Sequence, residues 1–200
     1  MPVTLIIIAI TVIISFAAWQ RPQLSNKMIY HGPSVVKGQW WRLISYGFIH
    51  ANRNHLLFNM ITLYFFGRFI EQLLIPRIGI PGFILFYLAG IVVAILPTHV
   101  RHYRDMGYRS LGASGAVSAV LFAYILISPW SMLLVMFVPV PAIVFAALYV
   151  AYSLWAGHRG RDAVNHSGHL TGALWGVGFL LILEPGLASR FLQELLKIPY

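Results

Sequence analysis

Long apolar blocks alternate along the chain with shorter polar stretches, and six of these blocks predict membrane-spanning helices. Because they are continuous rather than alternating in polarity, they favour α-helices over the strands of a barrel. A hydrocarbon core of about 30 Å is crossed by a helix of about 20 apolar residues, which is close to the length of these blocks. The pattern predicts an all-α, polytopic membrane protein with a single membrane domain over residues 1–200. The six spans cover about residues 3–19, 55–75, 80–97, 111–128, 131–155 and 168–183.

The segments between the spans differ in character. Residues 20–54 are rich in Trp, Tyr and Arg, so this first loop is predicted to lie in the membrane interface. The first apolar block lacks the basic region of a signal peptide, because no Lys or Arg precedes Arg21, and it is expected to be retained. Pro139 and Pro141 fall inside the fifth predicted span, where they are expected to bend it.

Composition supports membrane insertion and narrows the partners. Hydrophobic residues make up 59% of the chain and charged residues only 10%, whereas soluble domains carry about 25% charged residues. The net charge of +9 is scattered over loops and helix ends, which favours membrane lipids over nucleic acid as partners. The absence of cysteine excludes thiol catalysis, disulfides and thiolate metal sites.

Unusual polar residues stand at the starts of three spans. Spans two, four and six run in the same direction, so their N-terminal ends share one face of the bilayer. His55 and Asn59 begin the second span, Ser114 the fourth and His169 the sixth. These four side chains are therefore expected at a similar, shallow depth on one side of the membrane.

Two stripes of small residues predict that spans four and six pack closely. If they do, Ser114 and His169 come within hydrogen-bond reach, and a serine with a nearby base can attack a carbonyl carbon. Taken alone, a membrane serine more often only lets helices approach, and a lone histidine more often bonds a neighbouring helix. The stripes are Gly115, Ala119 and Ala123 in one span and Gly168, Gly172 and Gly176 in the other.

The second span offers hydrogen-bond donors for a developing oxyanion. His55 and Asn59 lie four residues apart and share a helix face. With the backbone N–H of Ser114 at a helix start, they form a three-donor set, although interhelical hydrogen bonding is the simpler alternative. Asp162 lies in a loop, so a Ser–His dyad is favoured over a triad.

A metal site and a cofactor are not expected. His50 lies five residues before His55, and His166 three before His169, but the H-E-x-x-H pattern is missing and carboxylates are scarce.

Several short motifs stand out together: Trp41-Arg42, His50, the run from His55 to Asn59, Gly112-Ala-Ser114-Gly115 and His166-Ser-Gly168-His169-Leu-Thr-Gly172. In these motifs the chain resembles the rhomboid intramembrane serine proteases. The resemblance implies that Ser114 is the nucleophile and His169 its base, with His55, Asn59 and the Ser114 N–H binding the oxyanion. It also implies that Gly112 keeps the approach to the serine open and, with Phe58, contributes to substrate binding.

The same resemblance implies the kind of substrate and the location. Substrates would be transmembrane helices cut near the bilayer surface after a small residue, entering between spans two and five. The protein would lie in the cell (inner) membrane. Many bacterial members carry an aromatic ring four residues after the serine, stacked on the catalytic histidine, where this chain has Ser118.

Charge distribution and resemblance imply opposite orientations. Positive-inside bias would place the loops with more Lys and Arg, and the active site, in the cytoplasm. Members of the family usually place the active site outside the cytoplasm. We adopt that orientation, because the basic residues of a first loop embedded in the interface weigh little in the positive-inside comparison. Ten of the 14 basic residues lie in the loops on the same side of the bilayer as the predicted active site, at positions 21, 27, 37, 42, 53, 101, 104, 109, 159 and 161.

Two other functions fit parts of the pattern. A non-catalytic rhomboid-like protein that binds or escorts membrane proteins would share the fold, but it has no need for both Ser114 and His169. A small-solute transporter would bind near the midplane of the bilayer, which fits poorly with polar groups at helix starts.

Overall fold

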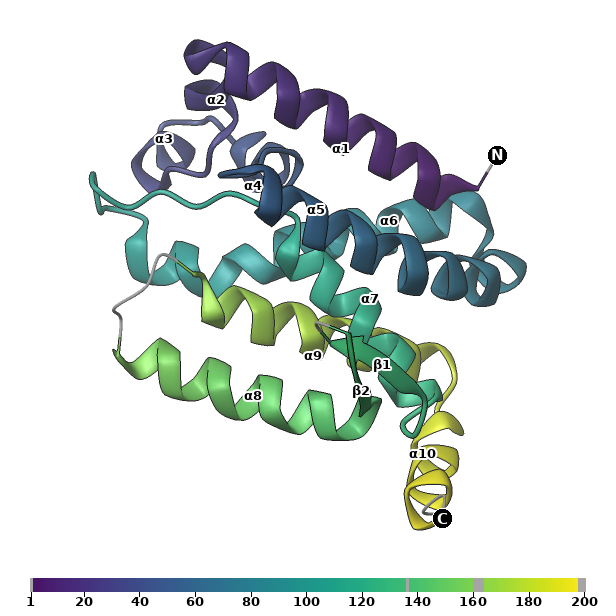
Figure 1. Cartoon of the computed structure of the whole chain (residues 1–200). Coiled ribbons are helices and arrows are strands. Elements are labelled where there is room, and N and C mark those ends of the chain that lie inside the picture. Colours follow the sequence, from purple (N-terminus) through teal and green to yellow (C-terminus); the bar gives the residue numbers. More distant parts are fainter. Residues whose placement is uncertain (1, 136, 160–163, 198–200) are drawn as a thin grey trace.

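Helix α7 (Ser114–Ile127) lies at the centre of the fold (Figure 1). The computed structural model describes residues 2–135, 137–159 and 164–197. All residues of α7 are buried except Ser114, Tyr124 and Ile127. It packs against α9 (His166–Leu183), while α1 (Val3–Gln20) and α8 (Ala142–Arg159) lie at opposite edges of the bundle.

Glycines allow α7 and α9 to pack with their backbones in contact. A Cβ atom added to Gly172 would overlap the backbone of Gly115, and one added to Gly176 would overlap the backbone of Ala119. The two stripes of small residues therefore pack against each other, which confirms the prediction. Their contact brings the start of α7 beside the start of α9.

The second and third predicted spans form one helical stretch that is broken at a glycine. Gly79 has φ 70° and ψ 174°, a conformation that glycine adopts at little cost, and it separates the two spans. The third span ends at His102 rather than near Pro97. The stretch consists of α5 (Arg53–Thr62), the π-helical turn η2 (Leu63–Gly67) and α6 (Arg68–His102).

The helices carry the surface of a membrane protein. Within the described residues, three helical stretches are long and apolar enough to cross a bilayer, and the shorter α7 is also apolar. Large apolar side chains such as Ile13, Leu85 and Ile182 point outward and are exposed, as expected where lipid replaces water. The three stretches are Val3–Gln20, Arg53–His102 and His166–Leu183.

The first loop, residues 20–54, is folded around a buried arginine. The Arg42 guanidinium donates hydrogen bonds to the carbonyl oxygens of Asn26 and Ile29, both at 2.7 Å, and to Gln39 Oε1 at 2.6 Å. These bonds tie together segments that lack a shared helix. The loop contains α2 (Pro22–Met28), α3 (Gly32–Val36), α4 (Arg42–Ser45) and the 3₁₀ turn η1 (Tyr46–Phe48).

The start of the fifth predicted span is a hairpin, so that prediction was wrong for residues 131–141. Strands β1 (Met132–Val135) and β2 (Val138–Pro141) pair antiparallel. Proline has no N–H to donate and clashes inside a helix, and β-branched valines favour strands. The span begins as α8 at Ala142, Pro139 and Pro141 precede it without bending it, and the fold is mostly helical rather than all-α.

The chain continues after α9 with the amphipathic helix α10 (Leu187–Leu196). It lies beside the C-terminal end of α7, where the indole N–H of Trp130 donates to the carbonyl oxygen of Glu194 at 2.9 Å. Leu192 and Leu196 are exposed on its apolar face. This end of the bundle is opposite to the one at which α7 begins.

Glu71 attaches α1 to α6. Its buried carboxylate accepts hydrogen bonds from the backbone N–H groups of Val3 at 2.6 Å and Thr4 at 2.9 Å. These N–H groups belong to the first turn of α1 and have no acceptor within the helix. A negative charge at this end also complements the helix dipole.

We expect Glu71→Gln to lower the free energy of unfolding by about 1–3 kcal/mol, because two charge-assisted hydrogen bonds become neutral or are lost. The measurement is the thermal unfolding midpoint in detergent. The control is Glu184→Gln, since Glu184 pairs with Arg77 and Arg190 at the surface, where ion pairs contribute about 0–1 kcal/mol. Equal midpoints for the two variants would contradict this role of Glu71.

Candidate active site

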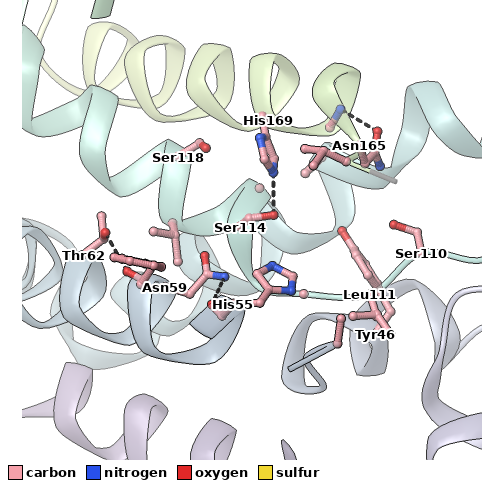
Figure 2. Close-up of a pocket in the computed structure, with 18 of the residues that line it drawn as sticks. Tyr46, His55, Asn59, Thr62, Ser110, Leu111, Ser114, Ser118, Asn165 and His169 are labelled. Atoms are coloured by element: carbon pink, nitrogen blue, oxygen red, sulfur yellow. Dashed lines mark hydrogen bonds between the residues drawn. The ribbon is translucent and has the colours of Figure 1, made fainter. Parts of the chain in front are cut away.

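The starts of α5, α7 and α9 meet around a cavity of about 720 Å³. His55 and Asn59 reach it from α5, Ser114 from α7 and His169 from α9. In Figure 2, His169 and His55 lie on opposite sides of the Ser114 hydroxyl. The structure thus brings together the four polar side chains that the sequence placed on one face.

Ser114 and His169 are joined by a short hydrogen bond. The distance from Ser114 Oγ to His169 Nε2 is 2.7 Å. Ser114 is the first residue of α7, so its backbone N–H has no acceptor within the helix. The imidazole is placed to take the hydroxyl proton, which is what a serine nucleophile requires. Asp162, the acid considered from the sequence, lies outside the described residues.

Asn59 is held by its own helix. Its amide Nδ2 donates to the carbonyl oxygen of His55 at 2.9 Å, and its side chain is buried. An amide nitrogen carries two hydrogens, so one N–H of Asn59 is not used by this bond. Both residues line the cavity next to Ser114.

The segment before Ser114 needs glycine at position 112. Gly112 has φ 116°, and a Cβ atom placed there would lie 2.6 Å from Cε1 of His55. Its N–H donates to the carbonyl oxygen of Tyr46 at 2.9 Å. A side chain here would displace the His55 ring, so glycine keeps His55 close to the start of α7.

The cavity extends from Ser114 between α5 and α8. Phe58 and Thr62 line it from α5, and Phe145 and Tyr149 from α8. Phe58 is also 56% exposed. The residue that the sequence nominated for substrate binding therefore lies on the wall of the same cavity as Ser114.

His50 links α1 to the residue just before Ser114. From the sequence it stood out only as part of a motif and as a possible metal ligand. Its Nε2 accepts from the N–H of Ala113 at 3.4 Å, and its Nδ1 lies 3.0 Å from Ser15 Oγ on α1. The Ser15 hydroxyl donates to the carbonyl oxygen of Phe48 at 3.0 Å, so the Nδ1–H of His50 is the donor to Ser15. Burial, and to a lesser extent His55, lowers the pKa of His50 to about 3.

The low pKa of His50 predicts a loss of stability in acid. The unfolded chain binds a proton at this histidine near its ordinary pKa of 6.5, whereas the folded chain does not until about 3. The free energy of unfolding should therefore fall as pH drops below about 6.5, by up to roughly 2 kcal/mol between pH 7 and pH 5. Thermal unfolding midpoints at these two pH values should differ more for the wild type than for His50→Gln. Equal differences would contradict the prediction.

Asn165 fixes the start of α9 and was not singled out in the sequence. Its side-chain oxygen accepts from the backbone N–H of Gly168 at 3.0 Å and from the hydroxyl of Thr98 at 2.9 Å. An asparagine just before a helix is a typical N-cap, and that signal was available. The cap ties α9 to α6 one turn before His169, and the helix begins at His166 rather than Gly168.

The comparison with known proteins identifies the family. A family model described as the Rhomboid domain matches residues 37–185, which include His55, Asn59, Ser114 and His169. The chain belongs to the rhomboid family. Rhomboids are integral membrane proteins and include serine proteases, which agrees with the apolar helices described above.

Named relatives of this rhomboid come from bacteria, plants and animals, and three of them are compared with it below. It is 34% identical over 91 residues to the rhomboid-named protein YdcA of Bacillus subtilis (strain 168), covering 46% of this chain and 43% of that protein. It is 26% identical over 179 residues to the mitochondrial RHOMBOID-like protein 12 of Arabidopsis thaliana, covering 81% and 52%. It is 28% identical over 165 residues to Rhomboid protease GluP of Bacillus subtilis (strain 168), covering 82% and 30%. The chain thus spans about half or less of the length of these relatives.

Proposed function

We propose that this rhomboid is an intramembrane serine endopeptidase that cleaves transmembrane helices with a Ser114–His169 dyad. The observation that carries the proposal is the 2.7 Å hydrogen bond between the two side chains, within a cavity between membrane helices. Ionisable side chains inside a membrane are costly and commonly functional. The name of one relative, Rhomboid protease GluP, adds support.

The proposed reaction has two steps. Ser114 Oγ attacks the carbonyl carbon of the scissile bond while His169 Nε2 takes the hydroxyl proton. His55, Asn59 and the Ser114 N–H stabilise the oxyanion of the tetrahedral intermediate. The intermediate collapses, the C–N bond breaks, and His169 returns the proton to the leaving amine. A water molecule, deprotonated by His169, then attacks the acyl carbon. The bond from this carbon to Ser114 Oγ breaks, His169 returns the proton to Oγ, and the product leaves as a carboxylic acid.

The cavity suggests how a helix reaches the serine. Its walls between α5 and α8 carry Phe58 and Phe145 on opposite sides. A substrate helix entering sideways there must unwind locally, because its peptide bonds are shielded while helical. Substrates are then transmembrane proteins cut near the bilayer surface, and a small residue before the scissile bond fits the approach beside Gly112.

The proposed topology has six spans in the cell (inner) membrane, with the active site facing the extracytoplasmic side. Residues 55–75 and 80–97 correspond to the two halves of the helical stretch broken at Gly79, and α8 supplies the fifth span. With six spans the C-terminus lies in the cytoplasm. A reporter that is active only in the cytoplasm should be active when it is fused after residue 200. A reporter that is active only outside the cytoplasm should be inactive there, and the reverse result would overturn the orientation.

The decisive experiment is cleavage of a tagged model transmembrane substrate by purified protein in detergent, together with labelling by a serine-reactive fluorophosphonate. Cleavage and labelling of the wild type are expected. If the protein instead binds or escorts membrane proteins without catalysis, neither cleavage nor labelling occurs. The immobilised protein then retains the substrate uncut. That result, obtained with protein shown to be folded, would rule out the protease and support the escort function.

A further inference from the structure

An aromatic ring from α8 stacks beside His169. The ring centroids of Tyr149 and His169 are 6.1 Å apart, and the ring planes differ by only 22°. This is within the range of offset stacking between aromatic rings. The Tyr149 ring is itself half-buried between Phe122 of α7 and Phe145 of α8, at centroid distances of 5.4 Å and 5.7 Å.

The hydroxyl of Tyr149 is anchored to α7. It lies 2.7 Å from the Oγ of Ser118, a buried residue. Ser118 follows Ser114 by four residues and therefore lies on the same face of α7. One helix face thus carries both the hydroxyl that His169 contacts and the hydroxyl that holds the ring beside His169.

The small side chain at position 118 leaves room for this arrangement. The Ser118 and Tyr149 hydroxyls are in contact, so a ring attached at position 118 would occupy the space that the Tyr149 ring now fills. In this chain the ring that faces the imidazole therefore comes from α8, which is also one wall of the cavity, and not from α7.

We propose that Tyr149 is the positioning residue of His169, and that its hydrogen bond to Ser118 couples the place of α8 to the reactivity of Ser114. This inference rests on the proposed function. With α8 seated on α7, the ring restricts rotation of the imidazole and keeps Nε2 on the serine hydroxyl. When α8 moves away from α7, the ring leaves with it and the imidazole loses its orientation. The site is then fully reactive only while α8 is seated.

Four variants separate the ring from its anchor. Tyr149→Leu removes the ring, and we expect the rate of fluorophosphonate labelling of Ser114 to fall by about 10- to 100-fold, as a small misplacement of a catalytic group can cause. Tyr149→Phe and Ser118→Ala keep the ring and should lower the rate by only a fewfold. The double variant Ser118→Tyr with Tyr149→Ser returns a ring to the same space and should recover most of the loss.

The matched control is Tyr152→Leu. Tyr152 is an exposed tyrosine on the same helix, and its ring packs on Trp155 and His166. Its removal should leave the labelling rate unchanged. Cleavage kinetics of Tyr149→Leu should show a lower kcat with little change in KM, because the substrate still enters the cavity. A higher KM with an unchanged kcat would place Tyr149 in substrate binding and overturn the inference.

A second readout does not depend on activity. The ring protons of His169, assigned by NMR through their loss in His169→Ala, should shift in Tyr149→Leu because the ring current of the tyrosine is lost, and should not shift in Tyr152→Leu. If the wild type neither labels nor cleaves, the proposed function fails, and this shift still shows whether the Tyr149 ring lies against the imidazole. Wild-type labelling rates in Tyr149→Leu, or an unmoved His169 signal, would overturn the inference.

Discussion

Replacing Ser114 with alanine is expected to abolish cleavage, with kcat/KM lower by at least about 10⁴-fold. The variant loses the only atom placed to attack the carbonyl carbon in the proposed reaction, Oγ at 2.7 Å from His169 Nε2. His169→Ala is expected to have an effect of similar size, because the hydroxyl then has no base. The measurement is the initial rate of cleavage of a model transmembrane substrate in detergent.

The double variant tests whether the two residues act as a unit. If Ser114 and His169 serve one step, removing both should cost about as much as removing either alone. If the fold-loss in kcat/KM of the double variant equals the product of the two single losses, the two residues do not act as a dyad. Two controls have the same chemistry away from the cavity: Ser189→Ala on α10 and His158→Ala on α8, whose side chains bond carbonyl oxygens of their own segments. Both should cleave at the wild-type rate.

Replacing Asn59 with alanine should lower kcat by about 10²- to 10³-fold and leave KM nearly unchanged. Asn59 lines the cavity beside Ser114 with one amide N–H not used by its bond to the His55 carbonyl. An oxyanion donor stabilises the transition state more than the bound substrate, so its loss appears in kcat. Steady-state kinetics with a range of substrate concentrations separates the two constants.

The control for this variant is Asn54→Ala, an exposed asparagine in the first turn of the same helix. It should match the wild type in both constants. A rise in KM with an unchanged kcat in Asn59→Ala would assign Asn59 to substrate binding instead. A fall in the unfolding midpoint alone, with normal kcat, would leave it as a structural link within α5.

Hydropathy located most of the helices but could not locate the hairpin. The segment 131–141 is as apolar as a membrane span, so its composition did not separate it from α8. Its backbone conformation depends on Pro139 and Pro141, whose missing N–H groups prevent a helix and are tolerated at the edge of a short ladder. Both prolines are visible in the sequence, but hydropathy does not register their missing N–H groups.

The meeting of Ser114 and His169 could be anticipated because the pattern is local. Span direction follows from counting spans, and close approach follows from small residues at four-residue spacing, which the contacts of Gly172 and Gly176 confirm. The supporting contacts could not be anticipated. His50 bonds Ser15 on α1, and Ser118 bonds Tyr149 on α8, pairs that are 35 and 31 residues apart in the chain.

The sequence by itself determined that this is a helical membrane protein of the rhomboid kind, and which face of it carries the polar residues. Hydropathy, helix direction and side-chain spacing are properties of short segments, so they can be seen without knowing the fold. The tertiary structure alone decided the contacts that support the site and the bundle: the Tyr149 ring beside His169, His50 against the N–H of Ala113, and the Glu71 carboxylate against the first turn of α1. Those contacts depend on the angles and depths at which separate helices pack, and no short segment encodes them.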